Sequence, residues 1–321
     1  MKRKNFYYSY ALLFAAFALL TSCVSSQSFL PIKGSGMPVD KNITVSDFNR
    51  IDVSGGFDVV LVQGNAEGVV LTAQENLFGC IKVEVVQGVL KIYTDANIMP
   101  TRPMKAKVSF KSIEKLEVSG GGDVKAETPV TVPELDVNMS GGGDLTLTVY
   151  TSELNGRISG GGDARLDGKA GNFDIVMSGG GDLSCNLESG NIACKLSGGG
   201  DLNLKNPGEA SDIVIEVSGG GDVEAALEAD RLKCAVSGGG NASFSGHATD
   251  LEIHVNGGGD IHAAGLVAQK ASVEASGGSD VHVNVSDELR GNISGGGDIY
   301  FAGNPAIVSI DTKGGSKIHK E

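Results

Sequence analysis

Aspartates recur at regular intervals in this sequence, each at the end of a run of glycines. The pentapeptide SGGGD begins at residues 119, 140, 159, 178, 197, 218 and 294. A carboxylate is a hard oxygen ligand, and Ca²⁺ takes about six to eight oxygen ligands. If the repeats stack, their aspartates form a column of calcium-binding oxygens. The candidate residues are Asp123, Asp144, Asp163, Asp182, Asp201 and Asp222.

Neighbouring aspartates in such a column repel one another, so another interaction must offset the repulsion. Two carboxylates about 5 Å apart repel by about 0.8 kcal/mol in water. One candidate is local, because an aspartate can accept backbone N–H bonds inside its own corner, as in an Asx-turn. The other is a cation held between repeats. Asn241, in the copy at residues 237–241, favours the local explanation, since an amide keeps the turn without the charge.

The glycine–aspartate pattern also resembles the calcium-binding repeats of RTX β-rolls, and this resemblance implies calcium-dependent folding. Those repeats carry the motif at both corners of a coil. Here the segments between SGGGD copies, such as Leu187–Gly190, lack it. We therefore predict corners that need no cofactor, and we keep calcium binding by the aspartate column as the alternative.

Histidines and cysteines offer a second kind of chemistry. His262 and His282 occupy equivalent positions in neighbouring repeats and His254 precedes a corner, so a zinc or copper site is conceivable. The spacing defines no fourth ligand, and we assign these histidines to an exposed face. Cys185 and Cys194 either pair across the core in an oxidising compartment or fill it as small apolar side chains. The sequence leaves both options open.

Catalytic signatures are weak throughout the chain. The glycine runs join strands and do not open a helix, so they do not form a phosphate-binding loop. The repeats carry no insertions that would build a groove, and the chain has no Trp and only 5% aromatic residues. A polysaccharide-processing β-helix enzyme is therefore only an alternative, and we predict a protein that is not an enzyme.

The repeat itself indicates the architecture. With degenerate copies at residues 237, 256, 276 and 313, the motif recurs eleven times at steps of 18 to 21 residues. Apolar residues such as Val118 and Val124 flank each copy and alternate with polar ones, which predicts two short strands per repeat with the motif as their corner. A coil of about 19 residues leaves no room for a helix. Residues 119–317 are therefore predicted to form an all-β, right-handed parallel β-helix.

The glycines are predicted to be structural. The first two glycines of every corner are invariant, which indicates positive φ angles or stacking too close for a Cβ atom. The third position accepts Phe57, Ser279 and Ser316, so we expect it to point outward. The predicted structural glycines are Gly120, Gly121, Gly141, Gly142, Gly160, Gly161, Gly179, Gly180, Gly198, Gly199, Gly219 and Gly220.

The N-terminal residues predict export. Residues 2–4 are basic, residues 11–20 are apolar, and Leu20-Thr21-Ser22-Cys23 follows, so residues 1–22 are typical of a signal peptide. The junction resembles the lipobox of bacterial lipoproteins, which implies cleavage before Cys23 and lipid attachment to it. Residues 23–45 are predicted to be a flexible tether.

Residues 46–118 keep the strand alternation but change its period. We expect a hairpin turn at residues 85–89 and a short helical turn within residues 73–80. Because the ends of a solenoid need covering, we predict that this region is a β cap with the first coils.

A family resemblance emerges from these segments together. Residues 48–94, which include the segment SGGFDVVLVQG, followed by the stacked SGGGD corners, resemble the GIN domain of bacterial lipoproteins, the head of "putative auto-transporter adhesins". The resemblance covers about residues 46–317. It implies a β-helical fold and a location in the cell envelope of Bacteroidetes-type bacteria, and it implies no particular activity or site.

Charge narrows the range of partners. Without residues 1–22 the chain keeps 23 Lys and Arg against 39 Asp and Glu, a net charge of −16, which argues against nucleic acid. We predict an adhesin-like or scaffold module that binds an envelope protein or a glycan. End-to-end or edge-strand self-association is a further option, because a free sheet edge can accept strands. Residues 24–28 carry no acid that would favour surface display, so we expect an outer-membrane anchor on the periplasmic face.

The first prediction tests the anchor. Cys23→Ser removes the lipid acceptor, and because acyl chains supply the membrane affinity, the protein should move from the membrane fraction to the soluble fraction. Fractionation followed by immunoblotting measures this. A variant that still pellets with membranes after a high-salt wash would exclude lipidation at Cys23 as the cause of attachment.

Overall fold

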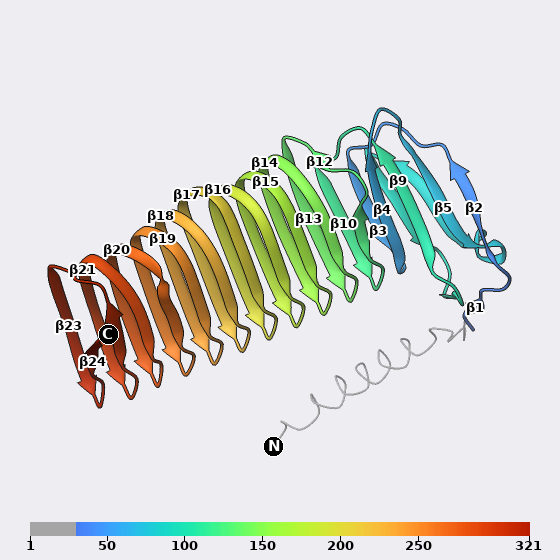
Figure 1. Cartoon of the computed structure of the whole chain (residues 1–321). Helices are drawn as coiled ribbons and strands as arrows, with labels where there is room; N and C mark the ends of the chain where they lie inside the picture. Colours follow the sequence, from blue (N-terminus) through green and yellow to red (C-terminus); the bar gives the residue numbers. More distant parts are fainter. Residues whose placement is uncertain (1–29) are drawn as a thin grey trace, which may run out of the picture.

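The protein is a long rod of stacked β coils (Figure 1). The computed structural model describes residues 30–321, so the predicted signal peptide and Cys23 lie outside the described residues. The rod is a β-solenoid of about 11 turns, and within residues 30–321 the single helical element is the 3₁₀ helix η1 (Glu75–Leu77). No helix in this part of the chain is long and apolar enough to cross a membrane. The predicted β-helical fold is confirmed.

Each central repeat forms one long strand that bends, where we expected two short strands. In β14 (Leu145–Gly160) and β15 (Ala164–Gly179), the pairing runs from one corner to the next. Tyr150 pairs with Lys169 on the side of the coil opposite the SGGGD corner, so the chain bends there while its backbone stays paired with the next coil. One strand ends at the SGGGD corner and the next begins after it. The remaining coils are β13 (Glu134–Gly141), β16 (Leu183–Gly198), β17 (Leu202–Gly219), β18 (Val223–Gly238), β19 (Ala242–Gly257), β20 (Ile261–Gly277) and β21 (Val281–Gly295).

Parallel pairing in register builds one continuous core. Met139 pairs with Ile158 and Ile158 with Met177, and all three side chains are buried. Equivalent positions of successive coils form a row, which we call a lane. Inward lanes are apolar and outward lanes polar, as the alternation predicts. A single coil could not bury its apolar side chains, but the stack covers both faces of each one.

The first position of each corner requires glycine for two reasons, its positive φ angle and the lack of room for a Cβ atom. Gly179 has a φ of 134°, and an added Cβ would lie 1.9 Å from the carbonyl oxygen of Gly160 in the preceding coil. Any other residue is strained at such a φ. The prediction is therefore confirmed for this position. The same positive φ recurs at Gly120, Gly141, Gly160, Gly198 and Gly219.

The second and third glycines have the opposite roles from those we expected. A Cβ added to Gly180 would meet nothing within 4 Å, whereas one added to Gly181 would lie 2.0 Å from the Gly162 carbonyl oxygen. The third position faces the neighbouring coil and the second faces solvent, because the tight corner turns the chain between them. No close approach therefore requires glycine at the second positions, Gly121, Gly142, Gly161, Gly180, Gly199 and Gly220.

Serines occur at the third position because they bond to the preceding coil, and they do not point outward. The hydroxyl of Ser279 donates to the Gly257 carbonyl at 3.0 Å, and that of Ser316 donates to the Gly295 carbonyl at 3.3 Å. Both side chains are buried. The first corner instead places Phe57 in the core.

A long insertion splits the first coil. β3 (Arg50–Ser54) and β4 (Phe57–Gln63) pair in parallel with β10 (Lys115–Gly120) and β11 (Val124–Ala126), which places Ser54 beside Ser119. The segment at residues 54–58 is therefore a corner of the same stack. A short strand, β12 (Val130–Thr131), completes the second coil by pairing with β14.

The inserted residues cover the N-terminal end of the stack. β7 pairs in parallel with β3 and β9 with β4, and antiparallel strands flank them. The predicted hairpin is confirmed between β6 and β7, where Gln87 and Gly88 have φ angles of 51° and 76°. The predicted helical turn is η1. The strand bounds are β5 (Gly68–Gln74), β6 (Ile81–Val86), β7 (Val89–Thr94), β8 (Ile98–Met99) and β9 (Met104–Phe110).

Part of the expected tether belongs to the folded body. Residues 38–43 form β2 (Pro38–Ile43), which pairs antiparallel with β5, and β1 (Ile32–Lys33) pairs with β8. The Pro and Gly residues of this segment, Pro31, Gly34, Gly36 and Pro38, suggested a flexible spacer, but the backbone of residues 38–43 extends the sheet at the edge of β5. The ordered body therefore begins before residue 46.

The corner geometry predicts a ranking of alanine substitutions. Gly179→Ala should lower the free energy of unfolding by roughly 3 kcal/mol or more, because the added Cβ collides with backbone at a positive φ, while Gly180→Ala should cost less than about 1 kcal/mol. The cost of Gly181→Ala should fall between these two, because its Cβ also meets backbone but Ser279 and Ser316 occupy the same position in other corners. Thermal unfolding followed by circular dichroism measures the series. Equal losses at all three positions would contradict the assigned geometry.

Candidate binding surfaces

The six predicted aspartates lie in one exposed column along the corners, and each links two coils. The Oδ1 atom of Asp182 accepts the backbone N–H of Asp201 at 2.9 Å. The Leu183 N–H donates in turn to the carbonyl oxygen of Asp201 at 2.8 Å. The side-chain bond repeats along the whole set at 2.8 to 3.1 Å. We call this chain of bonds the aspartate ladder.

The ladder corrects the local explanation for the aspartates. We expected each carboxylate to accept an N–H from its own corner, but the donor belongs to the next coil, because stacking in register brings that N–H within reach. A hydrogen bond to a charged group contributes about 1.5 to 3 kcal/mol. Two neighbouring carboxylates repel by about 0.8 kcal/mol in water and by about 3 kcal/mol at an effective dielectric of 20, so the bond is of the same size as the repulsion. The ladder therefore opposes the repulsion with bonds that the protein itself supplies.

The ladder is longer than the set predicted from the six intact central copies. It begins at Asp58 and continues through Asn241, whose Oδ1 accepts the Asp260 N–H at 3.0 Å. It ends where Asp298 accepts the N–H of Lys317 at 2.7 Å. The additional members occupy the same motif position, Asp298 in the intact copy at residues 294–298 and the others in degenerate copies, so the repeat alone could have identified them. The remaining members are Asp260 and Asp280.

At Asp298, the last carboxylate of the aspartate ladder, hydrogen bonding changes the pKa of the carboxyl group. The backbone N–H of Lys317 and the ring of His319 hold the pKa of Asp298 below its ordinary value. A lowered pKa in the folded state means that this contribution to stability is present at neutral pH and is lost as the pH falls through that pKa.

The structure brings two of the three predicted histidines together. The rings of His262 and His282 lie 5.6 Å apart, and the row continues through stacked Tyr300 and His319. His254 precedes its corner and bonds to Glu274 at 3.0 Å instead. Within residues 30–321, no three His, Cys, Asp or Glu side chains converge in a geometry that could hold a metal ion.

The cysteines of the core are free. Cys185, Cys194 and Cys234 are buried, and burial raises the pKa of the Cys185 thiol and raises those of Cys194 and Cys234 to about 12. Such thiols stay neutral and act as small apolar side chains. The disulfide between Cys185 and Cys194 that we considered is not formed in this structure.

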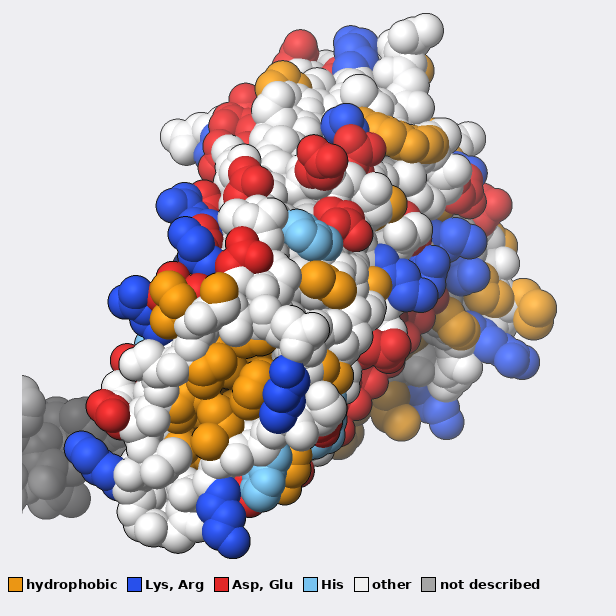
Figure 2. Space-filling view, turned by 60° about the vertical axis from the view of Figure 1, so that its left-hand side comes forward, with side chains coloured by type: hydrophobic (Ala, Val, Ile, Leu, Met, Phe, Trp, Pro, Cys, Tyr) orange, Lys and Arg blue, Asp and Glu red, His pale blue; other side chains and the backbone are white. Residues whose placement is uncertain are grey.

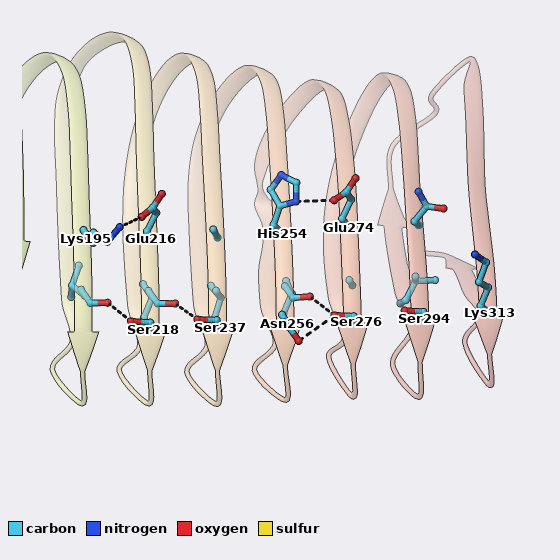
Figure 3. A pocket seen from close by; sticks show the side chains of 18 of the residues that line it. Lys195, Glu216, Ser218, Ser237, His254, Asn256, Glu274, Ser276, Ser294 and Lys313 are labelled. Atoms are coloured by element: carbon cyan, nitrogen blue, oxygen red, sulfur yellow. Dashed lines mark hydrogen bonds and ion pairs between the residues drawn. The ribbon is translucent and has the colours of Figure 1, made fainter.

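A groove of about 750 Å³ crosses the strands that precede the corners, from Lys195 to Lys313 (Figure 3). We expected no groove, because the coils carry no insertions. It forms without them, since the outward lane that contains Glu216 and His254 has the small Ala235 between them. The groove thus depends on side-chain length within a lane and not on loops.

Charges of both signs line this groove. Lys195 bonds to Glu216 at 2.7 Å, and His254 bonds to Glu274 at 3.0 Å. Beside them, His254 and Lys233 together hold the pKa of Glu252 below its ordinary value. These ion pairs are exposed, so each contributes little to stability and can be exchanged for contacts with a ligand.

A row of short polar side chains forms the other border of the groove. Ser218 and Ser237 donate to the carbonyl oxygens of Leu196 and Val217, both at 3.4 Å, and Ser276 bonds to Asn256 at 3.3 Å (Figure 3). Each hydroxyl that donates to the stack keeps acceptor capacity on its oxygen. The groove therefore combines charged groups on one border with hydroxyl and amide groups on the other.

Stacked coils, a covered N-terminal end and a polar groove along one side define a β-solenoid that presents a long, regular surface. The chain belongs to the family described as "putative auto-transporter adhesin, head GIN domain", whose model matches residues 47–209 and 192–305. The family resemblance inferred from the corner motifs is thereby confirmed. The chain matches no curated protein.

Three solved structures are similar to this chain over most of its length. One is a putative lipid binding protein from Parabacteroides distasonis, with 25% identity, a TM-score of 0.43, and coverage of 91% of this chain and 100% of that one. Another is a putative adhesin from Parabacteroides merdae, with 18% identity, a TM-score of 0.44, and coverage of 90% and 98%. A putative adhesin from Bacteroides fragilis has 20% identity, a TM-score of 0.34, and coverage of 90% and 100%.

The aspartate ladder predicts different effects for two substitutions at one rung. Asp182→Asn should change the free energy of unfolding by less than about 0.5 kcal/mol, because the amide oxygen still accepts the N–H, as at Asn241. Asp182→Ala should cost about 1 to 2 kcal/mol, because the Asp201 N–H loses its partner. Chemical denaturation measures both variants.

The same protein distinguishes the ladder from calcium binding. Treatment with EDTA should leave the β circular dichroism signal unchanged, and millimolar calcium should shift the melting temperature by only a few degrees. Unfolding in EDTA and refolding with calcium would overturn the self-sufficient ladder and would support the calcium alternative.

Proposed function

We propose that this protein is a non-enzymatic, lipid-anchored envelope protein that acts as an adhesin-like module and binds a protein or glycan partner in its groove. The groove is the observation that carries the proposal. It is a polar depression that crosses consecutive coils in a straight path. The description of the family as adhesins also supports binding in preference to catalysis.

The shape and chemistry of the groove suit an extended polar ligand. A straight depression with acidic, basic and hydroxyl groups can pair with alternating donors and acceptors along a polymer. Glu216 and Glu274 would meet cationic groups, and Lys195 and Lys313 would meet anionic groups, at opposite ends of the groove. The lining contains no Trp, Tyr or Phe on which a sugar ring could stack.

The anchoring proposal fits the orientation of the rod. β1 begins at Ile32, nine residues after Cys23, and nine extended residues span at most about 32 Å. A lipid on Cys23 would hold the covered N-terminal end near the membrane and leave the groove at a distance from it. We place the anchor in the outer membrane, with the periplasmic face favoured.

The groove can be tested by reversing its charge. In a Cys23→Ser background, the double variant Glu216→Lys and Glu274→Lys should bind at least about tenfold more weakly, because like charges would face the cationic groups of the partner. The control is Glu134→Lys with Glu228→Lys, which makes the same charge change on exposed glutamates outside the groove.

Binding would be measured on a glycan array and to intact bacteria. Circular dichroism should show the same fold for both double variants. Equal affinity of the two double variants would exclude the groove as the binding surface. Binding confined to the glycan array would identify the partner as a glycan, and binding confined to protease-sensitive sites on cells would identify it as a protein.

A further inference from the structure

The last coil leaves the apolar interior of the rod exposed at its C-terminal end. Within residues 30–321, β23 (Ile307–Gly314) pairs only with β21, and β24 (Ile318–Lys320) pairs only with β22 (Ile299–Ala302). Val308 lies in the inward lane opposite buried Leu289, yet 46% of it is exposed, because no described coil covers it. Figure 2 shows hydrophobic side chains gathered inside the rim of this end.

The two ends of the rod therefore differ. At the N-terminal end, the inserted strands cover the first coil, and inward residues such as Leu90 and Val108 are fully buried. At the C-terminal end, the inward residues Val308 and Ile318 are exposed by 46% and 37%. A contiguous apolar area that is rimmed by polar groups is typical of an interaction surface.

Charge identifies this end as the place where two copies can meet. Residues 119–298 carry 10 Lys and Arg against 27 Asp and Glu, so the sides of two rods repel each other. Residues 299–321 carry three Lys against two acidic residues. The end is nearly neutral as well as apolar, so a second copy meets no comparable repulsion there.

The last corner lacks the side-chain acceptor that each earlier corner offers to the next coil. Every earlier rung of the aspartate ladder supplies a side-chain oxygen to the N–H of the following coil, but the final corner has Lys317 at that position. An added parallel coil would find no acceptor for its own N–H. Antiparallel pairing along the free edge of β23 does not use the ladder and is therefore unaffected.

The outward face of β23 is complementary to itself in one antiparallel register. Asp311 and Lys313 lie two residues apart, so they point to the same side of the strand. If two β23 strands pair antiparallel about Thr312, each Lys313 lies opposite the Asp311 of the other copy. In this register the inward Ile310 and Thr312 side chains of both copies face one continuous core. Opposite charges placed directly across a pair of strands stabilise it.

We propose that two copies of this chain associate end to end through β23, as an antiparallel two-fold dimer whose cores become continuous. An isologous contact of this kind closes on itself and does not grow into a filament. The end face of a single coil is small, so the dimer belongs to the weak class of interfaces, with a dissociation constant on the order of micromolar.

Sedimentation velocity of the Cys23→Ser chain, at about 1 to 200 µM, tests the dimer without interference from lipid. The protein should shift from monomer to dimer over this range. Val308→Glu should keep it monomeric, because a carboxylate would enter the shared core. The matched control is Val267→Glu, a valine with 42% exposure on the side of the rod, which should dimerise like the parent.

Charge exchange tests the register. Asp311→Lys and Lys313→Asp should each weaken the dimer at least about fivefold, and the double variant Asp311→Lys with Lys313→Asp should restore it. A monomer at every concentration, a mass that keeps growing, or a dimer that survives Val308→Glu would overturn the proposal. A double variant that stays monomeric would overturn the antiparallel register. Melting temperatures near that of the parent establish that the variants are folded.

Discussion

The whole rod depends on how closely the backbones of successive coils approach at the glycine corners. At the first and third glycines the neighbouring carbonyl oxygen occupies the place where a Cβ would lie, so the coils stack in strict register. That register places each aspartate oxygen on the N–H of the next coil. The close approach of successive backbones therefore explains why the corners contain glycine. It also brings each carboxylate within hydrogen-bonding distance of the next coil, which stabilises the column of aspartates.

Strict register also determines where binding chemistry can arise. Because residues near the corners lie beside their equivalents in the next coil, a surface feature there is a property of a lane. The groove follows from the order of long and short side chains in one lane, with Ala235 between Glu216 and His254. The surface of one coil can thus change without disturbing the core, which suits the binding role that we propose.

A terminal coil has a neighbour on one side only, so its apolar interior is covered in a different way at each end of the rod. At the N-terminal end an insertion into the first coil supplies strands that cover it. At the C-terminal end the ladder reaches Lys317, which offers no side-chain oxygen to another coil, and the apolar interior of the last described coil is exposed. Self-association through β23 would cover this interior, and it would place two grooves on one elongated particle.

The sequence by itself determined the solenoid, its coil length, the inward lanes, the family and the position of the aspartate column, because each follows from a period within the chain. The donor to each carboxylate, the reversed roles of Gly180 and Gly181, the strand β2 and the groove were decided only by the tertiary structure. All four depend on contacts between segments that are distant in the sequence, and a local period carries no information about which atoms of two coils meet.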